Sequence, residues 1–152
     1  MGNLFNDDFR DFINALNNNE VEYLLVGGYA VIIHGYRRTT GDLDIWINPT
    51  QNNYEHLLKA CFQFGLPVLD MTAENFLHND AIDVFTFGRS PVSIDIMKTV
   101  KGCDFESAYK LRQEFFEGDL SVKFIHLNTL LKAKTASGRH KDLDDIEKLT
   151  GL

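Results

Sequence analysis

Hydrophobic residues recur at helical spacing near the start of the chain. In NLFNDDFRDFINALNNN, residues 3–19, the apolar positions are Phe5, Phe9, Phe12, Ile13 and Leu16. This spacing predicts a helix with one buried face, and the three asparagines predict its end. Comparable patterns predict further helices in YAVIIHG at 29–35, QNNYEHLLKACFQFG at 51–65, DFESAYKLRQ at 104–113, LNTLLKAKTASG at 127–138 and RHKDLDDIEKL at 139–149. Asp104 and Asn128 are the expected N-caps of their helices.

Short apolar runs between these segments predict strands. VEYLLVGG at 21–28 is a continuous run stopped by glycine, and DLDIWIN at 42–48 alternates between polar and apolar residues. AIDVFTFG at 81–88 and PVSIDIMKTV at 91–100 are two further strands, joined by the turn residues GRSP. EFFEGDLSVKFIH at 114–126 predicts a hairpin that turns at Gly118 and Asp119. LPVLD and MTAENFLHND, within residues 66–80, favour neither structure.

The order of these elements predicts the fold class. Helices and strands first alternate, several strands follow, and helices end the chain, which indicates an α+β fold with a mixed β-sheet and helices packed on one side. We expect one domain over residues 1–152, with a core at about 20–100 and a C-terminal hairpin and helices at 104–150. The sequence contains no internal repeat, low-complexity segment or interdomain linker.

Composition and charge restrict the classes of function. The chain is 44% hydrophobic and 24% charged, as folded proteins are. Its net charge of −7 argues against broad, sequence-blind binding of nucleic acids, but it leaves room for a local basic pocket. Cys61 and Cys103 lack zinc-site spacing and are expected to be reduced thiols. With no apolar run long enough for a membrane span and no recognisable signal peptide, we expect a cytoplasmic protein.

Two aspartates open the strand predicted at 42–48. Asp42 and Asp44 are separated by one residue, so a strand places both carboxylates on the same face while Leu43 and Ile45 point to the other. Two such carboxylates repel each other unless a cation lies between them, and Mg²⁺ prefers hard oxygen ligands. The alternative is that Asp42 is a loop residue and Asp44 a solvated strand residue.

Gly27 and Gly28 end the strand before the aspartates and begin a predicted helix. Glycine permits a close approach of backbone to phosphate, and a helix N-terminus offers free N–H groups. The alternative is a tight turn with a purely structural role. The segment fits neither the dinucleotide-binding fingerprint nor the P-loop. Because the stretch between Gly28 and Asp42 has room for one short helix and a loop, the two strands can be neighbours with both motifs at one end.

A third carboxylate would complete a site for two metal ions. The candidates are Asp83 in AIDVF and Asp95 in VSIDIM, each a lone acid within an apolar strand. A buried acid without a partner is unfavourable, so either one could instead be a hydrogen-bonded core or edge residue.

These motifs resemble the nucleotidyltransferase superfamily related to DNA polymerase beta. LLVGGYAVIIHGYRRTTGDLDIWI matches its pattern of two glycines followed by Asp-x-Asp between apolar residues. VSIDIMKTVKGCDFESAYKLR and LNTLLKAKTASGRHKDLDDIEKL resemble the tail of minimal bacterial members, akin to the nucleotidyltransferase toxins of abortive-infection systems. The likeness extends over about residues 20–150.

The resemblance implies a function and a role for each motif. Asp42 and Asp44 would be shared ligands of two Mg²⁺ ions, or of Mn²⁺, and Asp95 would be the third ligand and would help to activate an acceptor hydroxyl. Gly27 and Gly28 would hold the phosphates of an NTP. The product would be an acceptor, RNA, protein or a small molecule, that carries a nucleoside monophosphate. The resemblance also implies a toxin–antitoxin role with a small partner protein.

Cations in two segments are further candidates for nucleotide binding. Arg37 and Arg38 precede Asp42, and Lys134 and Arg139 flank the small residues TASG. Lysine suits a point contact with phosphate and arginine a bidentate one. The alternative for each pair is an ordinary solvated loop or helix end.

Other residues are given structural interpretations. Trp46 alternates with its isoleucine neighbours, and we expect packing rather than stacking on a base. The charged residues that follow Arg139 are interpreted as a capped, solvated helix start: Lys141, Asp142, Asp144 and Asp145.

Two other functions remain open at the level of sequence. The first is a catalytically silent nucleotide-binding or regulatory module of the same fold. The second is a nucleotide-sugar glycosyltransferase that uses Asp-x-Asp to bind Mn²⁺, although such a site would leave the upstream glycine pair unexplained.

Overall fold

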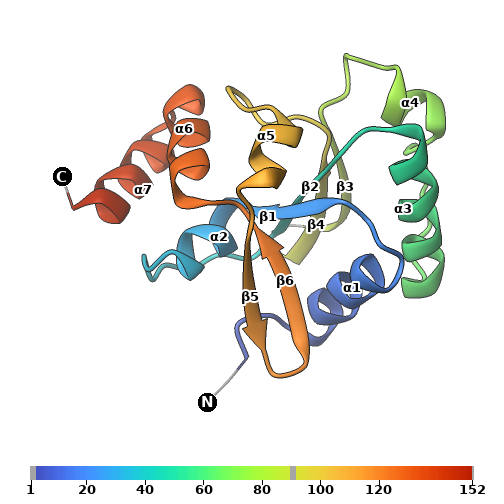
Figure 1. The fold of residues 1–152 in the computed structure, drawn as a ribbon, viewed down its shortest axis with the longest axis horizontal. Coiled ribbons are helices and arrows are strands. Elements are labelled where there is room, and N and C mark those ends of the chain that lie inside the picture. Colours follow the sequence, from blue (N-terminus) through green and yellow to red (C-terminus); the bar gives the residue numbers. More distant parts are fainter. Residues whose placement is uncertain (1–2, 90–91, 152) are drawn as a thin grey trace.

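The secondary structure follows the predicted order closely (Figure 1). A computed structural model describes residues 3–89 and 92–151. Its helices are α1 Asp7–Asn18, α2 Gly27–Ile33, α3 Gln51–Phe64, α4 Ala73–Leu77, α5 Phe105–Lys110, α6 Leu127–Ser137 and α7 His140–Thr150. Its strands are β1 Tyr23–Val26, β2 Leu43–Ile47, β3 Val84–Arg89, β4 Val92–Met97, β5 Gln113–Glu117 and β6 Leu120–Phe124. The ambiguous segment 66–80 contains α4, and the last two residues of the predicted turn GRSP, 90 and 91, lie outside the described residues.

The six strands form one mixed sheet in the order β3-β4-β2-β1-β6-β5. β2 runs parallel to β4, and β1 runs parallel to β6. The other neighbours are antiparallel, including the β5–β6 hairpin that turns at Gly118 and Asp119 as predicted. The α+β class with a mixed sheet is therefore confirmed.

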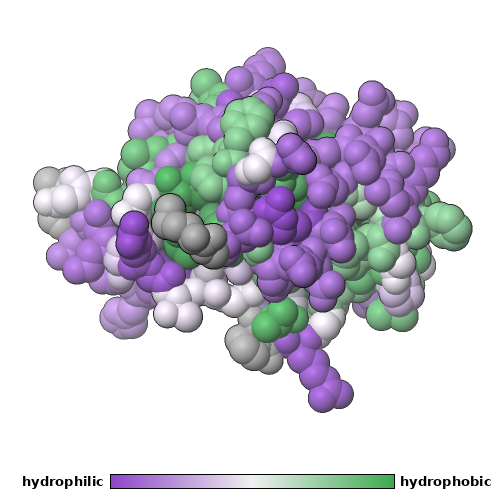
Figure 2. All heavy atoms as spheres, turned by 90° about the horizontal axis from the view of Figure 1, so that it is seen from below, coloured by the Kyte–Doolittle hydropathy of each residue, from purple (hydrophilic) through white to green (hydrophobic). Residues whose placement is uncertain are grey.

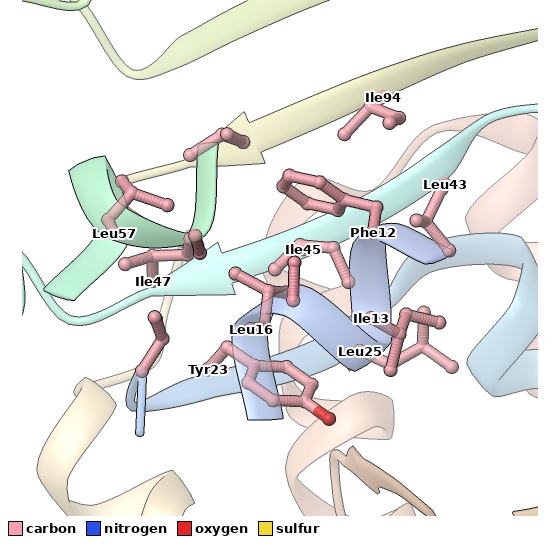
Figure 3. Packing of buried hydrophobic residues seen from close by; sticks show 14 of the residues in the cluster. Phe12, Ile13, Leu16, Tyr23, Leu25, Leu43, Ile45, Ile47, Leu57 and Ile94 are labelled. Atoms are coloured by element: carbon pink, nitrogen blue, oxygen red, sulfur yellow. The ribbon is translucent and has the colours of Figure 1, made fainter. Parts of the chain in front are cut away.

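One face of the sheet packs against α1, α3 and α4 (Figure 1). The odd positions of β2 point to this face, and each of them is fully buried. Figure 3 shows them between Phe12 and Leu16 of α1 and Leu57 of α3. This cluster contains most of the phenylalanines that are buried, so the aromatic content of the chain forms its main core.

The opposite face of the sheet is covered in part by α5 and α6. Trp46 points to this side, where its ring meets Phe105 edge-on at 5.1 Å. Its indole N–H donates to the carbonyl of Lys98 at 3.2 Å, so Trp46 is a packing residue as expected. The prediction of helices on one side was incomplete, because β1 is buried on both faces and its Leu24 and Val26 need cover from a second layer.

Capping side chains define the helix ends. Asp104 accepts a hydrogen bond from the backbone of Ser107 and caps α5 as predicted. The prediction that Asn128 caps α6 was wrong. His126 is the N-cap, and its Nδ1 accepts from the backbone N–H of Asn128. Since α6 begins at Leu127, Asn128 is already inside the first turn, where its side chain cannot act as the cap.

Exposed hydrophobic residues are spread over several elements. The large ones are Phe62, Leu69, Val84, Val92, Leu111, Phe116 and Leu143. Seen from below, the surface is mostly hydrophilic, with hydrophobic residues in small patches (Figure 2). None of the helices in the described ranges has the length and apolar character needed to span a membrane.

Candidate active site

The strand register brings the predicted acids together at one end of the sheet. Val26, the last residue of β1, pairs with Asp44 of β2, and Asp44 pairs with Asp95 of β4. The glycine turn and the Asp-x-Asp motif therefore lie side by side, as the sequence predicted. Asp83, the other candidate for a third acid, precedes β3 and is exposed, and its carboxylate accepts from the hydroxyl of Thr99. Geometry therefore favours Asp95 over Asp83.

A cavity of about 360 Å³ opens beside these strand ends. Asp42, Asp44 and Asp95 form one part of its wall, and Lys134 and Arg139 lie in the same lining. Gly27 and Gly28 contribute backbone to it. The remaining wall is mainly apolar: Val26, Val84, Met97, Val100, Ile125, Leu130 and Ala133. One cavity thus combines carboxylates, cations and an apolar surface that could hold an organic ligand.

Both glycines are required by what lies next to them. Gly27 has φ of +69°, a left-handed conformation that favours glycine. A Cβ at this position would also collide with the carboxylate of Asp44. A Cβ on Gly28 would collide with the side chain of Thr40, in the segment that leads to β2. The glycine pair therefore allows the acids and the preceding loop to approach the end of β1.

Asp44 has a perturbed acidity. Burial is the largest cause, followed by the negative charge of Asp95 and a hydrogen bond between the two carboxyl groups. Together with the charge of Asp42, these effects raise the pKa of Asp44 to about 7. Oδ1 of Asp95 is buried and has no hydrogen-bond partner within the described structure. A raised pKa and an unsatisfied carboxylate oxygen indicate that this site lacks positive charge.

Asp42 is oriented differently from the other two acids. Its Oδ1 accepts from the backbone N–H of Ser93 at 3.2 Å and from the hydroxyl of Ser93 at 2.9 Å. Across the described residues, no three side chains of the metal-binding types are close enough to form a ready-made metal site. Asp44 and Asp95 are thus a close pair, whereas Asp42 lines the same cavity with its carboxylate tied to β4.

Lys134 of α6 is almost fully buried in the cavity wall. Its side chain is 8% exposed, and its Nζ lies 3.2 Å from Asp142 and 3.0 Å from Asp145. A buried lysine is stable in its charged form only when it has such partners. Lys134 is therefore held in place by two carboxylates of α7.

Arg139, the N-cap of α7, is the more exposed of the two cations in the cavity wall. Its side chain is 68% exposed, and its Nε donates to Asp142 at 2.7 Å. The hydrogen bond to Asp142 is the largest cause that raises the pKa of Arg139, and the charge of Asp44 adds to it. Burial alone would raise the pKa of Asp142, but hydrogen bonds from Arg139 and Lys134 outweigh it and hold that pKa below its ordinary value.

Two solved structures with a similar fold are a nucleotidyltransferase and a nucleotidyltransferase-like protein. The lincosamide antibiotic adenylyltransferase LnuA, in its lincomycin-bound crystal structure, superposes with a TM-score of 0.53 at 16% identity and covers 98% of each chain. An antigenic nucleotidyltransferase-like protein from Paracoccidioides brasiliensis also gives a TM-score of 0.53 at 15% identity, over 95% of this chain and 75% of that one. The chain has the nucleotidyltransferase fold. No protein-family model matches the sequence, and no curated protein is similar to it.

In this nucleotidyltransferase fold, two of the four charged residues interpreted as a solvated helix start are buried. Lys141 and Asp144 are exposed as expected, although Lys141 also lines the cavity. Solvation was the wrong interpretation for Asp142 and Asp145, which are 0% and 1% exposed, although Asp142 does form a capping box with Arg139. The helical spacing places them on one face, but their burial depends on cations from other segments, which the sequence pattern does not reveal.

The two arginines predicted before Asp42 differ in their distance from the cavity wall, since Nη1 of Arg38 would lie 3.4 Å from a Cβ on Gly28. Neither Arg37 nor Arg38 is among the described residues that line it. Arg37 is exposed. Arg38 is largely buried, with its Nε 3.0 Å from Oδ1 of Asp145 and its Nη2 3.2 Å from Oδ2. The ion pair with Asp145 gives Arg38 a structural role, and its direct contact with a nucleotide stays a prediction.

Proposed function

We propose that the protein is a metal-dependent nucleotidyltransferase that transfers a nucleoside monophosphate from an NTP to an acceptor hydroxyl. The observation that carries the proposal is the pairing of Asp44 with Asp95 in one cavity with Lys134 and Arg139. This arrangement separates a carboxylate region, suited to cations, from a cationic region, suited to phosphates. The nucleotidyltransferases of similar fold support the same reaction class.

The acids fit divalent metal ions by their chemistry. All the donors are carboxylate oxygens, which Mg²⁺ prefers, and Oδ1 of Asp95 has no partner in the described structure. We propose that Asp42, Asp44 and Asp95 hold two Mg²⁺ ions, or Mn²⁺, with Asp42 giving up or sharing its contact with Ser93. Bound there, the ions would stabilise negative charge on the attacking and leaving oxygens.

Transfer of the nucleotide also requires a base for the acceptor and cations for the triphosphate. The acceptor oxygen forms a bond to the α-phosphorus, the bond to the bridging oxygen of the β-phosphate breaks, and pyrophosphate leaves. Asp95 is the base that takes up the proton of the acceptor hydroxyl. Lys134 and Arg139 bind the negative charge of the triphosphate and of departing pyrophosphate. Gly27 and Gly28 let phosphate oxygens approach the backbone.

Of the three acceptor classes predicted from the sequence, a small molecule fits best. Beside Asp95 the sheet continues only to its edge strand β3, where Thr86 pairs with Asp95 and Val84 with Met97. Residues 66–83, which lead into this strand, contain four acids and no lysine or arginine, and β3 itself carries one cation, Arg89. A polyanion such as RNA needs cations along its path. The fold shared with a lincosamide adenylyltransferase supports the same choice.

The predicted toxin–antitoxin role and small partner protein rest on the sequence resemblance alone. They would be tested by the neighbouring genes of related chains, where the absence of a small conserved companion gene would count against them. The complete set of three acids in one cavity favours turnover over the catalytically silent module.

Nucleotide binding should depend on the aspartates. We expect calorimetry with Mg²⁺ and each of ATP, CTP, GTP and UTP to detect binding by the wild-type protein. Asp42→Ala/Asp44→Ala should weaken it by at least about tenfold, because the metal-mediated phosphate contacts are lost. Asp83→Ala is the matched control, since it removes an exposed acid beside the same sheet and should change nothing. Failure of the wild-type protein to bind any NTP would refute the proposal.

Acceptor choice should follow charge. With the NTP identified by calorimetry carrying a labelled α-phosphate, we expect transfer to small hydroxyl compounds, best to those that carry protonated amines. Transfer to RNA should be weak, because β3 offers a single cation, Arg89, to replace its counterions. Labelling of RNA in preference to every small acceptor would show that the choice of a small-molecule acceptor is wrong. Nucleotidyl transfer itself would still be supported.

A further inference from the structure

The C-terminal helix α7 is docked mainly by charge, with the partly buried Leu149 as its contact with the apolar layer that contains Phe105 and Leu130. Its buried residues are Asp142 and Asp145, whereas Leu143 between them is 52% exposed. Helices at protein surfaces are ordinarily held by an apolar stripe. Where a helix buries carboxylates instead, the partners of those carboxylates must explain the burial.

We infer that Asp142 and Asp145 are positioning residues that hold Lys134 and Arg139 in the orientation needed for the triphosphate. The inference rests on the proposed function and assigns to α7 the control of nucleotide affinity. Neither aspartate needs to touch the nucleotide, since each acts through a cation.

The ion pairs connect three separate segments of the chain: the loop after α2, helix α6 and helix α7 with its N-cap. Asp145 accepts from Arg38, in the loop after α2, and its Oδ2 lies 3.0 Å from Nζ of Lys134 in α6. Asp142 contacts Lys134 at 3.2 Å and is bound by Arg139 through Nε and Nη2. The backbone N–H of Arg139 also donates to Asp142. Lys134 is thus fixed from two sides, and Arg139 from its own helix.

The balance of charge leaves the cluster able to bind an anion. Arg38, Lys134 and Arg139 are three cations, and the two aspartates neutralise only two of them. The excess positive charge lies in the wall of the cavity, which Lys134, Arg139 and Asp142 all line. A lysine whose long side chain is already ordered loses less conformational entropy when phosphate binds. The aspartates therefore orient the cations without cancelling their attraction for phosphate.

Asp145 also ties the nucleotide side of the cavity to the loop before the acids. Its partner Arg38 belongs to the loop that leads through Thr40 to Asp42. Thr40 packs directly on Gly28, where no Cβ could fit. One carboxylate thereby fixes both the cation Lys134 and the segment that carries the first acid of the site.

The test compares two carboxylates on the same helix. Asp145→Asn removes a buried acid, and Glu147→Gln removes an exposed one with the same change in net charge. Binding would be measured by calorimetry with the four NTPs and with inorganic tripolyphosphate, which has no base, each with Mg²⁺. We expect Asp145→Asn to raise the Kd of NTP and tripolyphosphate alike by about tenfold, as the loss of a charge-assisted contact would. Glu147→Gln should leave both unchanged.

A double-mutant cycle separates positioning from a merely structural role. If Asp145 acts through Lys134, Asp145→Asn should add little further loss of affinity in a Lys134→Met background. Losses that multiply would overturn the inference. Asp145→Glu provides a second variant if Asp145→Asn folds poorly, because it keeps the charge and displaces it by one methylene. It should weaken NTP binding without a comparable rise in the KM of the acceptor.

The remaining outcomes each decide a different claim. If the wild-type protein binds NTP and Asp145→Asn and Asp145→Glu bind it equally well, the inference fails and the proposed function stands. If the wild-type protein binds neither NTP nor tripolyphosphate, both fail.

Discussion

Asp44→Asn is expected to abolish nucleotidyl transfer while it stabilises the metal-free protein at neutral pH. Activity should fall by a factor on the order of 10³, because the site loses a carboxylate shared by both metal ions. Stability should rise because an amide of the same shape removes a buried charge beside Asp95. Activity with labelled NTP and thermal unfolding in the presence of a chelator would measure the two effects.

The stabilisation by Asp44→Asn should depend on pH. The pKa of Asp44 is about 7 in the folded protein, against an ordinary value of 3.8 in the unfolded chain. Between these values the folded state holds a proton that the unfolded state has released, so its stability falls as the pH rises. The wild-type protein should lose about 1.4 kcal/mol per pH unit relative to Asp44→Asn from about pH 4 to 7. The contribution of Asp44 to the stability of the folded protein is fully present below pH 4 and is lost above pH 7.

Comparison of the wild-type protein with Asp44→Asn removes the effect of other groups that titrate in this pH range. His34 has a pKa lowered chiefly by burial, so its contribution changes with pH in the opposite direction. It is present in both proteins and cancels in their difference. Added Mg²⁺ should raise the stability of the wild-type protein at pH 8 and leave Asp44→Asn nearly unaffected. If the difference in stability between the wild-type protein and Asp44→Asn does not vary between pH 4 and 7, the pKa of Asp44 is not raised by burial and the neighbouring carboxylates.

Gly27→Ala is expected to disable the site through the backbone. A Cβ at this position would collide with the carboxylate of Asp44, and φ of +69° is unfavourable for alanine by about 1–2 kcal/mol. The strain should lower stability, and displacement of Asp44 by the order of an ångström should reduce activity about 100-fold. Thermal unfolding and steady-state kinetics would measure both effects.

Gly35→Ala is the matched control for Gly27→Ala. Gly35 also has a positive φ, +117°, but nothing lies within 4 Å of the position that its Cβ would take. It should lower stability through backbone strain and leave kcat nearly unchanged. Equal losses of activity in both variants would show that the strain of a positive φ, rather than the collision with Asp44, is responsible.

The sequence determined the elements and the acids of this protein because both depend on local periodicity. The alternation of Leu43, Ile45 and Ile47 with Asp44 fixed which face of β2 is buried and which carries the carboxylate. The helical spacing of α1 and the glycine stop after β1 were readable for the same reason. Packing of Trp46 was expected from its place in an apolar strand, whereas its burial depends on cover from Phe105 of α5.

The tertiary structure decided which charged residues act together. Asp83 and Asp95 both follow an isoleucine, and only the pairing of β4 with β2 places Asp95 beside Asp44. Asp142 and Asp145 were indistinguishable from solvated helix residues in the sequence. Their burial depends on Lys134 and on Arg38, about a hundred positions away in the chain. The burial of an apolar residue can be predicted from the local period of the sequence. The burial of an ion pair cannot, because it depends on which distant segments come together in the fold.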